Sequence, residues 1–205
     1  MRVLFVRHGE TDWNLDGRYQ GRADTALCAA GRERARLIGE RMRGTNVSWI
    51  LSSPLLRAER TAALIKANLG KVRASVDSRL TEIDFGDWQG LTQQEIKRRW
   101  PEVLRSWKNN PDTFRFPAGE SLLEAYQRIL DFVRNPPWIT HAFEGDVLVV
   151  SHAGPIRLAS LIADQRSLES FRNLIVRSGE IYEFEWSAGV GLRRLSGGKP
   201  AKDRI

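Results

Sequence analysis

Short apolar runs punctuate this chain, and longer amphipathic segments separate them. Strands that contain such a run are predicted over residues 3–6, 49–53 and 146–151, and a further strand is predicted near residues 72–76. Uninterrupted apolar runs of this length are typical of strands that are buried on both faces of a parallel sheet. The pattern therefore predicts a buried sheet whose strands are joined by helices.

Start and stop residues predict the helices between these strands. One helix is expected over residues 31–43. A second should begin at Ser53-Pro54, because serine caps free amides and proline is tolerated in the first turn, and should end near residue 68. Capping boxes at residues 92–95 and 121–124 predict two further helices.

Residues 181–186 and 191–195 have the pattern of a closing hairpin. Strands that alternate with helices predict an α/β fold, a three-layer αβα sandwich with a mostly parallel central sheet. Chemistry is then expected beyond the carboxyl ends of the strands. We predict one domain over residues 1–196 and a disordered basic tail over residues 197–205.

Composition adds limits on the class of protein. The chain has 205 residues, of which 41% are hydrophobic and 28% charged, as in globular domains that bury a core without disulfides or structural metals. Cys28 is the single cysteine, so a reducing compartment is expected. The first apolar run ends at Arg7, too early for a signal peptide or a membrane span. These features predict a cytoplasmic protein that does not bind a membrane.

The net charge of +7 raises the question of a nucleic-acid partner. Residues 193–205 carry five basic residues and one acid, and residues 92–116 carry six basic residues and three acids. These two segments account for the whole excess, so the rest of the chain is balanced. We therefore predict no specific nucleic-acid partner. As partners we expect a small substrate and, at most, a second copy of the chain in a homodimer.

Two of the three histidines follow buried strands. His8 lies in Val6-Arg7-His8-Gly9 and His152 in Val150-Ser151-His152-Ala153-Gly154. Parallel strands deliver both side chains to one edge of the sheet, next to Arg7. Neutral imidazole is a good nucleophile toward phosphorus, and guanidinium binds phosphate oxygens bidentately. The pair predicts phosphate chemistry, whereas a lone histidine at a strand end would more often be structural.

Six blocks of sequence carry a resemblance to a known family. Residues 7–11, Arg-His-Gly-Glu-Thr, together with Asn14, resemble the signature of the histidine phosphatase superfamily, also called phosphoglycerate-mutase-like. Further blocks follow in family order at residues 17–24, 52–62, 80–90, 119–121 and 150–154. The resemblance implies the phosphoglycerate-mutase-like sandwich with a small helical cap segment at about residues 92–120.

The resemblance also implies roles for individual residues. His8 would attack phosphorus and carry the phosphoryl group, while Arg7, Arg57 and His152 would surround its oxygens. Glu82 would protonate the leaving oxygen and then activate the water that hydrolyses the phosphohistidine.

The expected substrate-binding residues supply neutral contacts: Asn14, Gln20, Gly21 and Ala153. Covalent catalysis of this kind requires no cofactor and no metal. The three histidines and one cysteine are also too widely spaced to predict a metal site.

Two other motifs are typical of different enzyme classes, but the elements that normally surround them are absent from this sequence. Cys28 and Arg34 fit the Cys-x5-Arg spacing of thiol-dependent phosphatases, yet no buried strand precedes this loop and its residues are typical of a helix start. The family commonly has a capping threonine where this chain has Cys28. Asp84-Phe85-Gly86 is kinase-like only as a tripeptide, because no glycine-rich nucleotide loop accompanies it.

Hydrolysis is favoured over mutase chemistry. Mutases usually have an arginine and a tyrosine just after the acid, where this chain has Ile83 and Phe85, and a longer cap with an arginine pair. The chain resembles α-ribazole phosphatases and broad-specificity small-molecule phosphatases, so α-ribazole phosphate and phosphosugars are candidate substrates. Phosphoglycerate mutase-type transfer and a non-catalytic binding domain remain alternatives.

The basic part of the cap segment suggests a role in choosing the substrate. We hypothesise that one of Lys97, Arg98, Arg99 or Arg105 favours substrates with a second anionic group. A solvated helix face is the alternative for each of these side chains.

Overall fold

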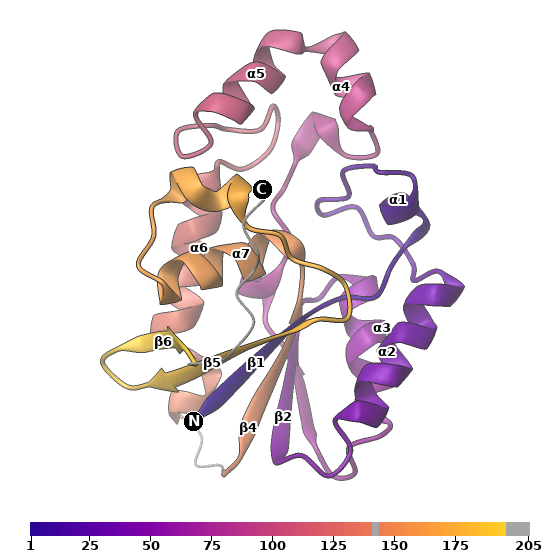
Figure 1. Ribbon diagram of the computed structural model, residues 1–205, viewed down its shortest axis with the longest axis vertical. Helices are drawn as coiled ribbons and strands as arrows, with labels where there is room; N and C mark the ends of the chain where they lie inside the picture. Colours follow the sequence, from indigo (N-terminus) through magenta and orange to yellow (C-terminus); the bar gives the residue numbers. More distant parts are fainter. Residues whose placement is uncertain (141–143, 196–205) are drawn as a thin grey trace.

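A six-stranded sheet forms the centre of the computed structural model, which describes residues 1–140 and 144–195 (Figure 1). The strand order is β3-β2-β4-β1-β5-β6. The strands are β1 (Arg2–Arg7), β2 (Val47–Ser52), β3 (Arg73–Val76), β4 (Asp146–Ser151), β5 (Ile181–Ser187) and β6 (Gly191–Arg194). Strands β1 to β4 run parallel, whereas β5 pairs antiparallel with β1 and with β6. The predicted hairpin is β5-β6.

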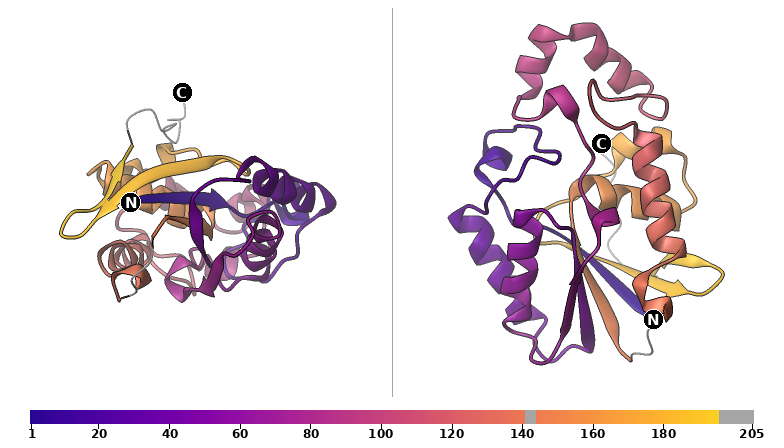
Figure 2. Two further views of the ribbon diagram at one scale, coloured as in Figure 1. Left: turned by 90° about the horizontal axis from the view of Figure 1, so that it is seen from below. Right: turned by 180° about the vertical axis from the view of Figure 1, so that it is seen from behind.

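Helices cover both faces of this sheet. The α-helices are α1 (Asp12–Leu15), α2 (Ala29–Arg41), α3 (Leu56–Lys66), α4 (Gln93–Arg99), α5 (Pro101–Asn109), α6 (Leu122–Arg134) and α7 (Ala153–Ala163). The 3-10 helices are η1 (Ser78–Leu80), η2 (Gly86–Trp88), η3 (Pro137–Thr140) and η4 (Leu168–Asn173). Figure 2 shows α2 and α3 on one side of the sheet and α6 on the other. The three-layer αβα arrangement with a mostly parallel sheet is confirmed.

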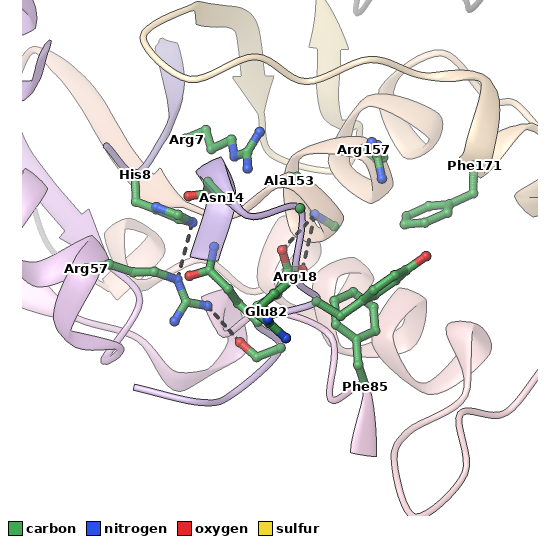
Figure 3. A pocket seen from close by; sticks show the side chains of 15 residues that line it. Arg7, His8, Asn14, Arg18, Arg57, Glu82, Phe85, Ala153, Arg157 and Phe171 are labelled. Atoms are coloured by element: carbon green, nitrogen blue, oxygen red, sulfur yellow. Dashed lines mark hydrogen bonds between the residues drawn. The ribbon is translucent and has the colours of Figure 1, made fainter. Parts of the chain in front are cut away.

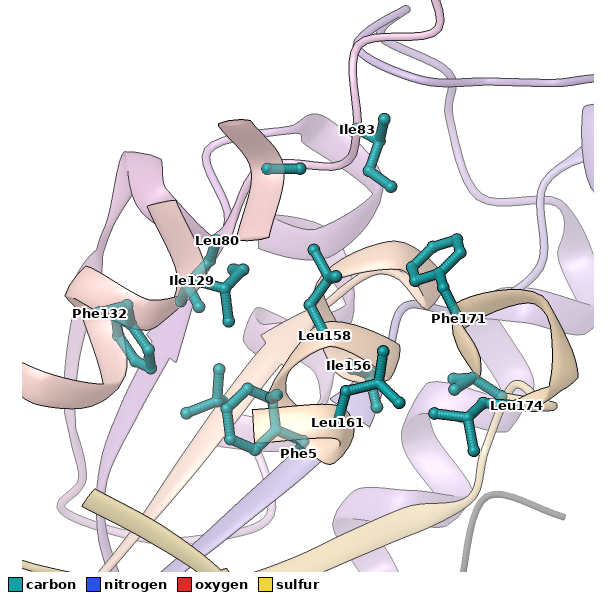
Figure 4. Close-up of a cluster of buried hydrophobic side chains, with 14 of the residues drawn as sticks. Phe5, Leu80, Ile83, Ile129, Phe132, Ile156, Leu158, Leu161, Phe171 and Leu174 are labelled. Carbon is teal, nitrogen blue, oxygen red and sulfur yellow. The ribbon is translucent and has the colours of Figure 1, made fainter. Parts of the chain in front are cut away.

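Alternating side chains of β1 build the two halves of the core. Val3 and Phe5 face the cluster that contains α6 and α7, while Leu4 and Val6 face the cluster under α2 and α3. All four side chains are at most 5% exposed. Figure 4 shows Phe5 among Ile129, Phe132, Leu158 and Leu161 of the larger cluster. Burial on both faces is the reason that this strand reads as an uninterrupted apolar run.

The start of α3 differs from the prediction. The helix begins at Leu56 rather than next to Ser53, and its N-cap residue Leu55 supplies no side-chain cap. The amide of Leu56 instead donates to Asp24 Oδ1 at 2.7 Å, so an acid from a distant loop takes the place of a local cap. The Ser53 hydroxyl accepts from the Leu55 amide at 3.3 Å and lies 2.7 Å from His152 Nε2, a contact that the sequence pattern around Ser53 does not reveal.

Other helix starts follow the sequence. Both capping boxes are present, at Thr92 with Glu95 and at Ser121 with Glu124. Cys28 is the N-cap of α2, which begins two residues before the predicted start, and its Sγ accepts from the Gly31 amide at 3.4 Å. Helices α4 and α5 form the predicted cap, above the end of the sheet to which β1 points (Figure 1). The predicted tail, residues 197–205, lies outside the described residues.

Candidate active site

The ends of β1 and β4 bring the two strand-end histidines together. Arg7 pairs with Ser151 in the parallel ladder, and the amide of His8 donates to the Ser151 carbonyl at 2.9 Å. His8 and His152 therefore leave the sheet side by side. Their ring centroids are 5.0 Å apart, and the side chains are 3% and 0% exposed.

The hydrogen bonds of His8 define its tautomer. Nδ1 lies 2.7 Å from the Gly9 carbonyl, which can only accept, so Nδ1 carries the proton. Nε2 keeps its lone pair and accepts from Arg57 Nε at 3.2 Å. Burial, followed by the charges of Arg7 and Arg57, holds the pKa of His8 well below 6.5. The ring is therefore a neutral nucleophile whose attacking atom is Nε2.

Two arginines, Arg57 and Arg7, add positive charge next to His8. Arg57, in the first turn of α3, is fully buried and donates from Nη1 to the Ala23 carbonyl at 2.8 Å and from Nη2 to the Gly21 carbonyl at 2.7 Å. Burial lowers its pKa to about 10. Arg7 donates from Nη1 to the Val176 carbonyl at 3.1 Å, and its buried Nε has no partner among the described residues. Both guanidiniums thus remain cationic at neutral pH and are held by backbone carbonyls.

His152 lies behind this group at the N-cap of α7. Its Nε2 is 2.7 Å from the Ser53 hydroxyl, and its buried Nδ1 has no partner in the part of the chain that the structure describes. Burial is the main reason that its pKa is well below 6.5, with His8, Arg57 and Arg7 adding to the effect. His152 is thus a neutral ring, and it is not among the residues that line the cavity described below.

Glu82 faces the same space from the loop that follows η1. Its side chain is buried, and its two carboxylate oxygens lie 3.1 and 3.3 Å from the Gly154 amide in the first turn of α7. The Ile83 amide donates to Oε1 at 2.9 Å. A Cβ on Gly154 would overlap Oε1, so this position needs glycine for the carboxylate to approach.

A salt bridge from α6 holds the loop that carries Glu82. Arg128 donates from Nη1 to the Thr81 carbonyl at 2.7 Å and pairs through Nη2 with Glu120 at 2.8 Å. Glu120 Oε1 also accepts from the Asp84 amide at 3.0 Å. The backbone is thus fixed on both sides of Glu82 by one guanidinium and one carboxylate.

These groups surround a cavity of about 280 Å³ (Figure 3). The predicted residues that line it are Arg7, His8, Asn14, Gln20, Gly21, Arg57, Glu82 and Ala153. Asn14 Oδ1 accepts from the amide and the hydroxyl of Thr11, at 3.1 and 3.2 Å, so its amide nitrogen is the group left for a ligand. Gln20 Oε1 accepts from Thr25 Oγ1 at 2.6 Å, which likewise leaves the amide nitrogen.

The sequence prediction missed a second set of lining residues: Arg18, Tyr19, Phe85, Arg157 and Phe171. Figure 3 shows Phe85, Arg157 and Phe171 on the side of the cavity away from His8 and Arg57. Arg157 has a sequence signal, because it lies four residues after Ala153 and so on the same face of α7. Phe171 comes from η4 and has no such signal.

The basic cap residues are not where the hypothesis placed them. Lys97, Arg98, Arg99 and Arg105 are exposed, and none lines the cavity. Ile96, Leu104 and Trp107 are the buried residues of α4 and α5, so the basic side chains occupy the opposite, solvated faces. The hypothesis for these four residues is therefore wrong, because the amphipathic packing of the cap turns them outward.

Within residues 1–140 and 144–195, no group of three or more His, Cys, Asp or Glu side chains is arranged to hold a metal ion. None of the described helices has the length and apolar character needed to cross a membrane.

Comparisons with known proteins agree with this geometry. The family model for the histidine phosphatase superfamily (branch 1) matches residues 3–195. Phosphoserine phosphatase 1 of Hydrogenobacter thermophilus is 36% identical over 160 residues, which cover 77% of this chain and 73% of that protein. A 2,3-bisphosphoglycerate-dependent phosphoglycerate mutase of Methylobacterium is 30% identical, covering 86% and 87%. The crystal structure of the α-ribazole phosphatase from Shigella flexneri is 27% identical, with a TM-score of 0.83 and full coverage of both chains.

Proposed function

Because the chain belongs to the histidine phosphatase superfamily (branch 1), we propose that it hydrolyses a small phosphorylated metabolite through a phosphohistidine on His8. One observation carries this proposal. Nε2 of His8 belongs to a neutral ring and accepts from the Arg57 guanidinium at 3.2 Å, and Arg7 lines the same cavity. A nucleophile and the charge that stabilises phosphoryl transfer are thus already in place.

In the first step, His8 Nε2 forms a bond to phosphorus while the bond from phosphorus to the ester oxygen breaks. Protonated Glu82 gives its proton to the departing oxygen, so the product alcohol leaves neutral. Arg7 and Arg57 hold the phosphoryl oxygens as negative charge gathers on them. His152 Nδ1 has no partner in the described part of the protein, and we propose that it donates to the phosphoryl group once the ring moves toward the cavity, which it does not line in this structure.

In the second step, the Glu82 carboxylate takes a proton from water, and the water oxygen attacks phosphorus. The bond from phosphorus to His8 Nε2 breaks, inorganic phosphate forms, and His8 returns to its neutral state. Glu82 is again protonated and ready for the next ester. The two steps use one carboxyl group in both directions.

Trapping the intermediate tests this proposal. The purified protein, mixed briefly with a ³²P-labelled phosphomonoester and quenched, should carry label that is lost in acid and retained in alkali. His8→Ala should carry no label and should lose phosphatase activity. Full activity in His8→Ala, or label that is stable in acid, would rule out the mechanism.

Mutase chemistry is the second candidate, because a phosphoglycerate mutase is among the similar proteins. In that reaction a second substrate hydroxyl, rather than water, would take the phosphoryl group from His8. Release of inorganic phosphate and interconversion of phosphoglycerates, measured in one reaction mixture, separate the two. We expect phosphate release. A non-catalytic domain would give neither product and no labelled His8.

The substrate is proposed as a class. We place α-ribazole phosphate and phosphosugars first in a screen of phosphorylated metabolites, since Tyr19, Phe85 and Phe171 give the cavity an aromatic side suited to a ring. We assign the reaction to the cytoplasm on the single cysteine, Cys28.

A further inference from the structure

A second, smaller cavity continues from the candidate active site toward the cap. Its volume is about 110 Å³, and it shares Tyr19, Phe85, Arg157 and Phe171 with the first cavity. The two spaces are therefore adjacent parts of one elongated site. A substrate whose phosphate lies at His8 would extend into the second part if it were long enough.

Aromatic rings line the passage between the two parts. Tyr19 and Phe85 lie edge to face with their centroids 5.2 Å apart, and Trp107 and Phe171 are 6.0 Å apart. The side chains of Trp107 and Phe171 are almost fully buried, so their positions are fixed by packing. This passage favours an apolar or planar middle portion in the substrate.

The far end of the site is positively charged. Lys108, Arg157 and Arg172 line the second cavity, and no carboxylate among the described residues does so. Lys108 Nζ makes no hydrogen bond or ion pair with any residue that the structure describes. Asp112 and Glu169 line a neighbouring cavity that shares Lys108 and Arg172 with the second cavity. The elongated site thus has cations at both ends.

The structure fixes the backbone at Lys108, whose side chain is exposed and lines the second cavity. Lys108 follows the buried Trp107 near the C-terminal end of α5, and Arg172 of η4 donates to its backbone carbonyl at 2.8 Å. Arg157 lies over the ring of Phe171, 5.4 Å from its centroid. Lys97 and Arg105, on the same cap, line neither cavity.

We propose that the preferred substrates are phosphomonoesters with a second anionic group, a carboxylate or a phosphate, which Lys108 binds at the far end of an aromatic-lined site. The proposal rests on the proposed function, because the first anion is the phosphate at His8. Arg172 adds positive charge at the same end, and Arg157 lies in the part that both cavities share. An ester with a distal anion should therefore be a better substrate than the matched ester without one.

The test uses substrate pairs that differ only in the distal charge. One substrate is 4-(2-carboxyethyl)phenyl phosphate and the other is its carboxamide, whose leaving groups have nearly the same pKa. Substrates with spacers of one to three carbons between the ring and the anion vary the distance from the reacting phosphate to the distal group. A phosphonate in place of the carboxylate shows which of the two anions is preferred. The wild-type protein should have a kcat/KM about 10-fold higher for the anion at low ionic strength, as for one charge-assisted hydrogen bond.

Lys108→Gln should reduce this preference to less than about 3-fold, and added salt should reduce it in the wild-type protein. Lys97→Gln, an identical change on the exposed face of the cap, should keep the wild-type preference. No preference in the wild-type protein at any spacer length, or an unchanged preference in Lys108→Gln, would overturn the proposal. The proposed function itself fails if the wild-type protein does not hydrolyse phenyl phosphate, or if His8→Ala hydrolyses it as fast as the wild-type protein does.

Discussion

Replacing Arg128 with glutamine tests whether the loop that carries Glu82 must be held in place for proton transfer. The substitution removes the bonds to the Arg79 and Thr81 carbonyls, at 2.6 and 2.7 Å, and the salt bridge to Glu120. Arg128 and Glu120 are 17% and 12% exposed, so the bonds are only partly screened by water. Bonds of this kind contribute about 1.5–3 kcal/mol each but do not add fully. Glu120 keeps its contact with Arg22, and we expect a loss of about 2–3 kcal/mol in the free energy of unfolding.

The effect on activity should depend on the leaving group. An alkyl phosphate needs the Glu82 proton, and a displacement of about 1 Å in such a group can cost about 100-fold in rate. A dinitrophenyl phosphate leaves readily as an anion and needs little help. We expect kcat/KM to fall about 10- to 100-fold for the alkyl ester and less than about 3-fold for the dinitrophenyl ester.

Arg79→Gln is the matched control for this variant. Arg79 ties η1 to α6 through Asp131 at 2.8 Å and the Asn135 carbonyl at 3.0 Å, without touching residues 81–84. It should destabilise the protein without changing the ratio of kcat/KM for the two esters. An equal fall on both esters in Arg128→Gln, or the same change of ratio in Arg79→Gln, would refute the reasoning. If Arg128→Gln does not fold, the ratio of kcat/KM for the two esters is measured in Glu120→Gln instead. An equal fall on both esters in that variant would refute the reasoning.

Three further predictions follow from the geometry. Because the pKa values of His8 and His152 are well below 6.5 in the folded protein, the unfolded chain binds protons first as the pH falls below 6.5. The free energy of unfolding should therefore decrease from pH 7 to 5.5 by about 1 kcal/mol per ring, and denaturant titration of the His8→Gln/His152→Gln variant should show a flatter dependence. Gly154→Ala should lower kcat/KM for an alkyl phosphate about 10- to 100-fold, because the added Cβ displaces the Glu82 carboxylate. The circular dichroism spectrum should be unchanged. Wild-type activity in this variant would contradict the proposed position of the acid. Cys28→Ser should raise the free energy of unfolding by about 0.5–1 kcal/mol in thermal denaturation, since a hydroxyl caps α2 better than a thiol, and Cys28→Ala should not.

Local pattern was sufficient for the framework of the fold and for part of the site. Apolar runs placed β1 and β4, because strands buried on both faces need unbroken apolar sequence. Parallel pairing then placed His8 and His152 at one edge, and the structure has their rings 5.0 Å apart. Capping boxes marked the starts of α4 and α6, since their hydrogen bonds join residues only three positions apart.

Contacts between distant parts of the chain account for what the sequence did not predict. The cap of α3 comes from Asp24, 32 residues away, so the local serine did not mark the helix start. Arg128 reaches the Thr81 carbonyl across 47 positions. No periodic pattern describes contacts of this kind.

The charged residues of the cap also combine features that local sequence predicts with features that depend on distant contacts. The sequence is enough to predict that this segment is basic and helical, because charge and capping are properties of residues close together in the chain. Which basic side chain faces the site depends on tertiary packing. Packing of Leu104 and Trp107 against the core turns Arg105 to solvent and leaves Lys108 at the second cavity. That choice depends on how Trp107 of α5 packs against Phe114, Phe116 and Phe171, which the order of the residues in α5 does not fix.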